Sequence, residues 1–366
     1  MPKLSLLAEM RHEDRDDKTP LALYNVEGLA TYTNRRYPYT KTRGKLQASY
    51  QFTPDYRGAL GADYETIDRG AFTPTSTVSG ISALRQKTEE IGYRAELRRR
   101  MSDNVSGAIS FVTSRRDGSA WLWPNAVQGV SPVAPGAIIT STATFMPSLA
   151  DRRRDKVRVS AVWQPSDALT LQVGLDSGRD RFSSPSNYGL RRSGMDTLSL
   201  DWDYLLSARW TLNGYLSRGN QTLAQSRPDG YVMAFDNDST SVGIGAVGRP
   251  TGKIEVGGTL SFFEDRNEYA QTLDTTASFG SAALLAATGG LPDIVFRTTE
   301  IRLFGRYTLS KTSSVRLDLI HHRARFNDWS YGYDGTPFLF SDNTTLTQQH
   351  RQNVTFVGLT YTHRWE

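Results

Sequence analysis

Charged side chains interrupt several otherwise apolar runs of this chain, and their spacing indicates a chemical role. Within a run they stand two or four residues apart, and on a β-strand such residues share one face because successive side chains alternate. An Arg or Lys on a lipid-facing surface near mid-bilayer costs about 2–4 kcal/mol. We therefore expect these residues to face the lumen of a membrane barrel and to contact a partner or solute there. They are Arg94, Glu96, Arg98, Arg158, Asp176, Asp201, Asp203, Glu255, Arg302, Arg306, Arg316 and Asp318.

A glycine-rich segment, GIGAVG at 243–248, matches the G-x-G-x-x-G pattern of dinucleotide-binding sites. Such a site needs the glycines to follow a strand and to open a helix. Here they lie inside a strand-like run that continues into the turn RPTG at 249–252. We therefore predict a strand at this position and no nucleotide site.

Histidines and acidic residues give little support to a metal site. His321 and His322 are neighbours, and neighbours on a strand point to opposite faces, so they cannot easily share one metal ion. The acidic clusters at 13–17 and 236–238 lack the loop pattern of an EF-hand, and we interpret them as solvated loop acids. No Ser/His/Asp set, pair of catalytic carboxylates or phosphate-binding loop stands out, so we predict no catalysis and no metal or other cofactor in this chain.

Fourteen runs of alternating apolar and polar residues are the elements that would position the charged residues. In the last run Val357, Leu359, Tyr361 and Trp365 share one face. The predicted strands are 3–15, 42–53, 57–69, 88–101, 104–116, 155–164, 168–182, 195–206, 210–222, 239–249, 253–268, 298–310, 314–328 and 351–365. The predicted lipid-facing sets are Val157, Val159, Ala161 and Trp163; Leu169, Leu171, Val173 and Leu175; Ile254, Val256, Leu260 and Phe262; and Val315, Leu317 and Leu319.

The connections between these runs alternate between tight turns and long polar loops. This pattern predicts an all-β fold, an antiparallel up-and-down transmembrane β-barrel of about 14 strands with short periplasmic turns and long extracellular loops. An even count puts both termini on the periplasmic side. Interfacial aromatic girdles are expected near strand ends, and the candidates are Tyr204, Trp210, Tyr307, Tyr361 and Trp365.

Composition fits an exported membrane barrel. No run approaches the roughly 18 apolar residues of a membrane helix, and cysteine is absent, which excludes disulfides and covalent haem attachment in this chain. The net charge of +5 comes from mixed signs and gives little support to a nucleic-acid partner. Two basic runs, 98–100 and 152–154, would contact lipid head groups or a partner, or form a solvated rim. The N-terminus lacks the pattern of a secretory signal, so we expect a mature form or a piece of a longer protein.

Five segments of the framework have a familiar sequence: 92–102 (GYRAELRRRMS), 114–119 (SRRDGS), 163–169 (WQPSDAL), 334–338 (DGTPF) and 353–359 (NVTFVGL). Together they resemble the MtrB/PioB family of decahaem-associated outer-membrane barrels, and the resemblance extends from about residue 3 to 365. It implies a barrel in the outer membrane of a Gram-negative bacterium that sheathes and positions a periplasmic multihaem c-type cytochrome for electron transfer. The haem belongs to that partner, which in turn contacts an extracellular cytochrome or reductase.

The strand count departs from the family, whose members have more strands, a signal peptide and an N-terminal extension. Barrel width grows with strand number, and fourteen closed strands would be too narrow for a folded decahaem protein. We expect residues 1–366 to be a single barrel domain, either the C-terminal part of a larger barrel or a shortened barrel with another role. Pairing between Leu4–Ala8 and Val357–Tyr361 distinguishes these cases. The alternative function is a passive outer-membrane porin for small polar solutes, and the alternative fold is a soluble β-sandwich.

Overall fold

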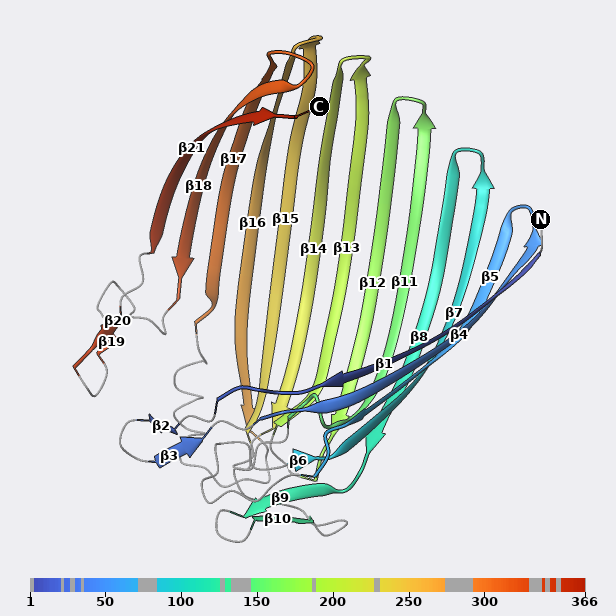
Figure 1. Ribbon diagram of the computed structural model, residues 1–366, viewed down its shortest axis with the longest axis vertical. Helices are drawn as coiled ribbons and strands as arrows, with labels where there is room; N and C mark the ends of the chain where they lie inside the picture. Colours follow the sequence, from blue (N-terminus) through green and yellow to red (C-terminus); the bar gives the residue numbers. More distant parts are fainter. Residues whose placement is uncertain are drawn as a thin grey trace.

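The computed structural model describes most of the chain: residues 3–20, 23–26, 30–33, 36–71, 84–125, 129–132, 146–185, 189–226, 231–273, 292–328, 338–339, 343–346 and 350–365. Fourteen antiparallel strands form one curved sheet, and they follow one another in chain order (Figure 1). None of the described residues belongs to a helix long and apolar enough to cross a membrane.

The strands of this sheet match the fourteen predicted runs in number and position. They are β1 (Leu4–Arg15), β4 (Tyr39–Thr53), β5 (Tyr56–Asp68), β7 (Lys87–Ser102), β8 (Val105–Gly118), β11 (Asp151–Ser166), β12 (Leu169–Ser183), β13 (Gly189–Ser207), β14 (Trp210–Ser226), β15 (Tyr231–Thr251), β16 (Ile254–Leu273), β17 (Ile294–Thr308), β18 (Ser313–Asn327) and β21 (Arg351–His363). The all-β, up-and-down fold is therefore confirmed.

The largest boundary error is at the start of β15, which begins at Tyr231 and not at 239. The segment Asp236-Asn237-Asp238 is polar on both faces of the strand. Apolar alternation requires lipid on one face, so it disappears where a strand extends beyond the membrane. Backbone pairing to β14 and β16 nevertheless continues through these residues.

Seven further short strands lie in connections that the sequence predicted as plain loops. They are β2 (Leu23–Val26), β3 (Ala30–Thr33), β6 (Leu84–Arg85), β9 (Trp121–Asn125), β10 (Gly129–Pro132), β19 (Phe338–Leu339) and β20 (Thr345–Leu346). β6, β9 and β10 form a three-stranded sheet, and the others form two hairpins. The runs are too short to show a period of two, which explains why the sequence pattern missed them.

The two termini lie at the end of the sheet that carries the short turns (Figure 1). Leu4 at the start of β1 pairs with Tyr50 near the end of β4, and His363 at the end of β21 pairs with Ser313 at the start of β18. Both registers place the termini beside short turns, as predicted.

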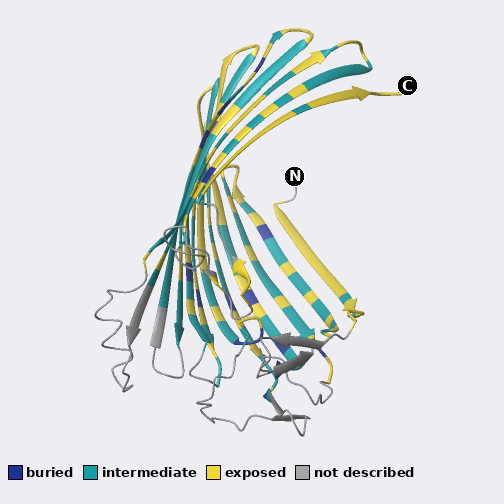
Figure 2. Cartoon of the chain, turned by 90° about the vertical axis from the view of Figure 1, so that its left-hand side faces the viewer, coloured by how far each residue is buried: buried dark blue, intermediate teal, exposed yellow. Residues whose placement is uncertain are grey.

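The sheet is open. β1 and β21 are its two outermost strands, and among the described residues they do not pair with each other. Figure 2 shows both edge strands as exposed along nearly their whole length. Of the two cases that the sequence left open, the structure therefore does not show a closed cylinder of fourteen strands.

Buried apolar side chains gather at the long-loop end of the sheet. Leu84, Trp121 and Leu149 are all at most 6% exposed. They surround the buried Arg85, which donates hydrogen bonds to the carbonyls of Gly118, Ser119 and Leu149 and to Asp151 at 2.6 Å. This cluster fastens β6 and β9 to the ends of β8 and β11.

Candidate functional site: the charged lumen face

The strand register places all twelve predicted lumen residues on one face of the sheet. Directly paired residues of antiparallel strands share a face. One such row runs from Glu96 on β7 through Ser110 and Arg158 to Asp176 on β12. The register of the following strands places the predicted residues of β13 to β18 on the same face. They are Asp201, Asp203, Glu255, Arg302, Arg306, Arg316 and Asp318.

The opposite face carries the predicted lipid-facing residues. Val159 pairs with Leu175 and Ile109, and Leu319 pairs with Leu303. These five side chains are 37–49% exposed. A wide apolar surface of this kind would aggregate in water, and it requires contact with lipid. The soluble β-sandwich alternative is thereby excluded.

Aromatic side chains line the short-turn end of the apolar face, as predicted. Tyr307, Val315 and Tyr361 form one row across β17, β18 and β21. Tyr204 also lies on this face and is 37% exposed, and Trp365, two residues beyond the end of β21, is 89% exposed. Tyr and Trp favour the interface between lipid and water, so this row marks the periplasmic border of the membrane.

The charged face is the more sheltered of the two. On β7 the inward residues Thr88 and Glu90 are 3% and 20% exposed, whereas the outward residues Ile91 and Tyr93 are 43% and 54% exposed. Side chains on the concave side of a curved sheet crowd together. We therefore identify the charged face as the lumen face.

The lumen face divides into two walls of seven strands each. The N-terminal wall is the lumen face of β1, β4, β5, β7, β8, β11 and β12. In its regularly paired parts the cations are Arg11, Arg15, Lys41, Arg43, Lys45, Arg57, Arg94, Arg98, Arg100, Arg116, Arg152, Arg154, Lys156 and Arg158. The anions are Glu9, Glu13, Asp63, Glu65, Glu90, Glu96, Asp176 and Asp180, so cations clearly outnumber anions there.

The C-terminal wall is the lumen face of β13 to β18 and β21. It carries fewer charges than the N-terminal wall, and here anions outnumber cations. The cations in its regularly paired parts are Arg302, Arg306 and Arg316. The anions are Asp201, Asp203, Glu255, Asp265, Glu300 and Asp318. Phe263, Phe296 and Phe326 form an aromatic ladder on this wall, with ring centroids 6.1 and 4.6 Å apart.

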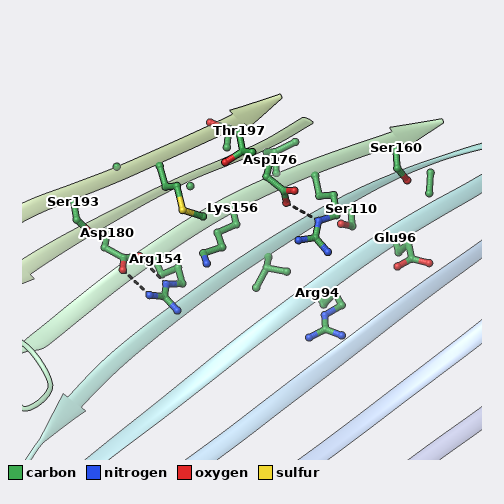
Figure 3. Close-up of a pocket in the computed structure, with 18 of the residues that line it drawn as sticks. Arg94, Glu96, Ser110, Arg154, Lys156, Ser160, Asp176, Asp180, Ser193 and Thr197 are labelled. Atoms are coloured by element: carbon green, nitrogen blue, oxygen red, sulfur yellow. Dashed lines mark hydrogen bonds and ion pairs between the residues drawn. The ribbon is translucent and has the colours of Figure 1, made fainter. Parts of the chain in front are cut away.

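A hollow of about 740 Å³ lies mainly on the N-terminal wall, from β7 to β12, and extends onto β13 and β14. Figure 3 shows Arg94, Arg154, Lys156 and Asp180 around it. The floor consists of small residues such as Ser110, which leaves space above the sheet between the long charged side chains.

Most charges around this hollow are paired. Arg154 donates to both oxygens of Asp180, at 2.7 and 2.6 Å, and Arg158 donates to Asp176 at 2.5 Å. Arg98 pairs with Glu96 two residues away. Arg94 is 3.7 Å from Asp63.

Lys156 is the exception among the charges of this hollow. The aliphatic part of its side chain lies over Gly178, and its carbon atoms are 3.2–3.6 Å from the position that a Cβ of residue 178 would take. Among the described residues Lys156 makes no ion pair within 4 Å. Figure 3 shows its ammonium between Arg154 and Arg94. The hollow therefore presents surplus positive charge.

A second hollow of about 550 Å³ adjoins the first and shares Val112 and Arg154 with it. Its most sheltered ion pair joins Arg152 to Glu90 at 2.7 Å, with side chains only 14% and 20% exposed. Lys41 and Arg43 both contact Glu65, at 3.0 and 2.5 Å. The two hollows make one continuous charged trough along the N-terminal wall.

The sequence prediction missed most of the N-terminal wall. Lys41, Lys45, Arg154 and Lys156 were not among the twelve predicted lumen residues. The signal was present, because Arg152, Arg154, Lys156 and Arg158 stand two apart on β11 and share the lumen face. For the basic run at 152–154 the sequence left three alternatives open, which were contact with lipid head groups, contact with a partner and a solvated rim.

The basic runs at 98–100 and 152–154 split between the two faces. Arg98, Arg152 and Arg154 lie in the lumen, while Arg99 stacks outside over the ring of Tyr56 at 5.0 Å and Arg153 is 3.6 Å from Asp155. Both runs are thus partly lumen wall and partly outer surface.

The glycine-rich segment 243–248 lies within β15 and pairs with β14 and β16, so the predicted strand is confirmed. Gly243 and Gly248 give space to aromatic neighbours. An added Cβ would stand 2.3 Å from an atom of Tyr215 or Trp210, respectively.

The acids predicted to lie in solvated loops fall only partly in loops: Asp16 and Asp17 follow β1, whereas Glu13 and Asp14 lie within β1, and Asp236 and Asp238 lie within β15. Asp17 accepts hydrogen bonds from the Thr19 hydroxyl, the Thr19 amide and the Tyr37 amide, which lower the pKa of its carboxyl to about 2. Asp236 and Asp238 both accept hydrogen bonds from the side-chain amide of Asn220, at 2.6 and 3.0 Å.

His321 and His322 face opposite sides of the sheet. His321 is hydrogen-bonded to Thr355, and His322 lies 3.5 Å from Glu300. Within the described residues no group of three or more His, Asp or Glu side chains is arranged to bind a metal.

Comparison with protein families matches residues 1–365 to the family described as "Putative outer membrane beta-barrel porin, MtrB/PioB". The chain belongs to the MtrB/PioB family. It is therefore an outer-membrane β-barrel protein, and the family is one of porins, not of enzymes. No curated protein matches the chain.

Several solved outer-membrane proteins are among the structures to which this MtrB/PioB chain is similar. The copper transporter OprC matches with 10% identity and a TM-score of 0.42, covering 87% of this chain and 57% of OprC. The FrpB iron transporter from Neisseria meningitidis matches with 8% identity and a TM-score of 0.41, covering 90% and 58%. The Pseudomonas putida toluene transporter TodX matches with 11% identity and a TM-score of 0.28, covering 99% and 88%. This chain thus spans a little over half the length of OprC and FrpB.

Proposed function

We propose that this chain sheathes and positions a multihaem c-type cytochrome for electron transfer across the outer membrane, without catalysis of its own. Membership of the MtrB/PioB family over residues 1–365 supports this function. On this proposal the haem is carried by the cytochrome, and the barrel keeps lipid away from it and seals the membrane around it.

The observation that carries the proposal is the density of charge on the lumen face. Charged side chains line all seven strands of the N-terminal wall, and many keep substantial exposure, for example 41% for Arg94 and 67% for Arg158. A soluble cytochrome has a hydrated, polar surface. Such a surface fits a lumen of solvated ion pairs better than an apolar one, because a charge buried against apolar atoms loses its hydration.

The open sheet bears on the width of the lumen. β1 and β21 each leave one row of backbone groups unpaired within the described sheet, and unpaired groups are not tolerated in lipid. We propose that additional strands pair with both edges and close a wider barrel around the cytochrome. This arrangement removes the objection that fourteen closed strands are too narrow.

The proposal is tested by purifying the tagged chain from native outer membranes and staining for covalently bound haem. We expect a c-type cytochrome to co-purify in constant ratio. Ser110→Trp fills the floor of the lumen and should lower that ratio severalfold. Ile109→Trp is the matched control, since it adds the same bulk to the neighbouring lipid-facing position. Absence of haem protein from the wild-type sample, or equal loss in both variants, contradicts the sheath.

A passive channel for small polar solutes is the second candidate, and the connected hollows of the N-terminal wall favour it. An empty charged lumen would conduct ions. Conductance of the purified, cytochrome-free chain in planar bilayers tests this candidate. A steady open conductance that haem protein does not block would support a passive channel over a sheath.

A further inference from the structure

The N-terminal wall has positive charge that its own anions do not neutralise. Lys45, Arg57 and Lys156 make no ion pair within 4 Å among the described residues. Among the described residues Arg116 makes no ion pair within 4 Å, and it donates hydrogen bonds to the carbonyl groups of Pro147 and Ala150. Uncompensated cations thus recur along the full height of this wall, from Arg116 near the long loops to Arg57 near the short turns.

The C-terminal wall has the opposite surplus. Asp201 and Asp203 lie in the lumen of β13 with no ion pair within 4 Å among the described residues. Arg302 and Arg316 are paired, with Glu300 at 2.5 Å and Asp318 at 2.8 Å. Among the described residues of this wall that lie in regular strand register, Arg306 is the only cation without an ion pair.

We propose that the N-terminal wall binds an acidic protein surface on the molecule that occupies the lumen and thereby fixes the rotational orientation of that molecule. This inference rests on the proposed sheath function. The occupant it requires is dipolar, with clustered Asp and Glu side chains facing β4 to β12 and a less acidic side facing β13 to β21.

The extent of the wall favours a protein surface over a small anion. The two hollows together span strands β1 to β14, and the cations of the wall without an ion pair lie on four different strands, with Lys45 on β4, Arg57 on β5, Arg116 on β8 and Lys156 on β11. A single phosphate or carboxylate contacts one or two arginines. A protein surface with many carboxylates can meet all of them at once.

Binding of this kind must depend on salt. Charges in a water-filled lumen are screened over about 8–10 Å at 0.1–0.15 M ionic strength. Complementary charges across an interface contribute to specificity and to the association rate. Increasing NaCl should therefore weaken retention of the occupant on the N-terminal wall.

The test uses the full chain in detergent and a fluorescent polyglutamate peptide as a probe of defined chemistry. Lys156→Glu is expected to weaken peptide binding about tenfold at low salt. Arg306→Glu, an equal charge change at an unpaired lumen cation of the C-terminal wall, is expected to change it less than about twofold. Lys156→Arg should keep wild-type affinity. Heat-modifiable gel migration verifies that each variant folds.

Three results would overturn the inference. They are equal effects of Lys156→Glu and Arg306→Glu, equal affinity of the wild type for polylysine, and displacement of the peptide by inorganic phosphate more effectively than by NaCl of equal ionic strength. The last result would indicate a small-anion site. A failure of the sheath proposal would give a different result. The native preparation would then contain no haem protein, while polyglutamate would still bind to the purified chain.

Discussion

The two walls of the lumen are built on the same framework and carry different chemistry. Each has seven antiparallel strands, and the outward faces of both carry Leu, Val and Ile residues with similar exposure, for example Val159 at 38% and Leu303 at 48%. Inside, the N-terminal wall is a trough of ion pairs with surplus cations. The C-terminal wall has fewer charges, surplus anions and an aromatic ladder.

The difference separates what the membrane dictates from what the protein is free to vary. Lipid imposes the same apolar face on every strand, because charge there is costly. The lumen imposes no such uniformity. An asymmetry confined to the lumen face therefore reflects the molecule that this face meets, which is why we assign function to the walls and not to the outer surface.

The largest expected effect comes from moving charge to the outer face, which should be equally harmful in both halves. Val159→Arg and Leu303→Arg should each reduce the free energy of unfolding by about 2–4 kcal/mol. The lumen controls Ser160→Arg and Ser261→Arg should each change it by less than about 1 kcal/mol. Urea titration in phospholipid vesicles measures these values. A harmful Ser160→Arg together with a tolerated Val159→Arg would reverse the face assignment.

A smaller effect distinguishes the ion pairs of the two walls. Arg152→Met leaves the half-buried Glu90 without its partner and should destabilise the barrel by about 2 kcal/mol, less than for a fully buried pair because both side chains keep some solvent contact. Arg316→Met removes a more exposed pair, 43% for the arginine, and should cost less than about 1 kcal/mol. Equal costs would mean that the ion pairs of the N-terminal wall are no more sheltered than those of the C-terminal wall.

The sequence predicted the framework well because lipid enforces a period of two. Val157, Val159, Ala161 and Trp163 reveal β11 without any structural information, and the same alternation assigned all twelve predicted charges to the correct face. Whether these twelve contact a partner or solute stays a prediction.

The asymmetry of the lumen could not be predicted in this way. Which lumen charges pair with one another, and which are left over, depends on side-chain contacts across several strands. Arg152 meets Glu90 from 62 residues away. The hydrogen bonds of Arg85 to the 118–119 and 149–151 segments likewise depend on tertiary contacts that leave no periodic signal.

The aromatic ladder gives a further, smaller contrast. Phe296→Leu keeps the apolar volume on the C-terminal wall but loses the ring contact with Phe326 at 4.6 Å, and it should cost about 1 kcal/mol. Val112→Leu, an apolar change of lumen residue on the N-terminal wall, should be nearly neutral, since no ring contact is lost. Urea titration of both variants measures the difference, and a neutral Phe296→Leu would show that the ladder adds no stability.

The smallest effect concerns the connection that follows β1. The hydrogen bonds to Asp17 favour its ionised carboxylate. The stability that they give to this connection is therefore complete above 3.8, the pKa of the carboxyl in the unfolded chain, and is lost as the pH falls through about 2. The Thr19 and Tyr37 amides should therefore be protected from hydrogen exchange at pH 5 and lose protection near pH 2. Asp17→Asn should show weaker protection at both pH values. Unchanged protection of the wild type at pH 2 would contradict this account.

Cysteine labelling tests the central claim most directly, because the chain has no cysteine of its own. Arg158→Cys and Val159→Cys are adjacent on β11 and are assigned to the lumen and to lipid, respectively. In isolated outer membranes stripped of cytochrome, a water-soluble maleimide should label Arg158→Cys and not Val159→Cys. In native membranes that retain the cytochrome, labelling of Arg158→Cys should fall severalfold. Equal labelling at both positions, or labelling of Arg158→Cys that does not depend on the cytochrome, would contradict a charged lumen that surrounds a protein.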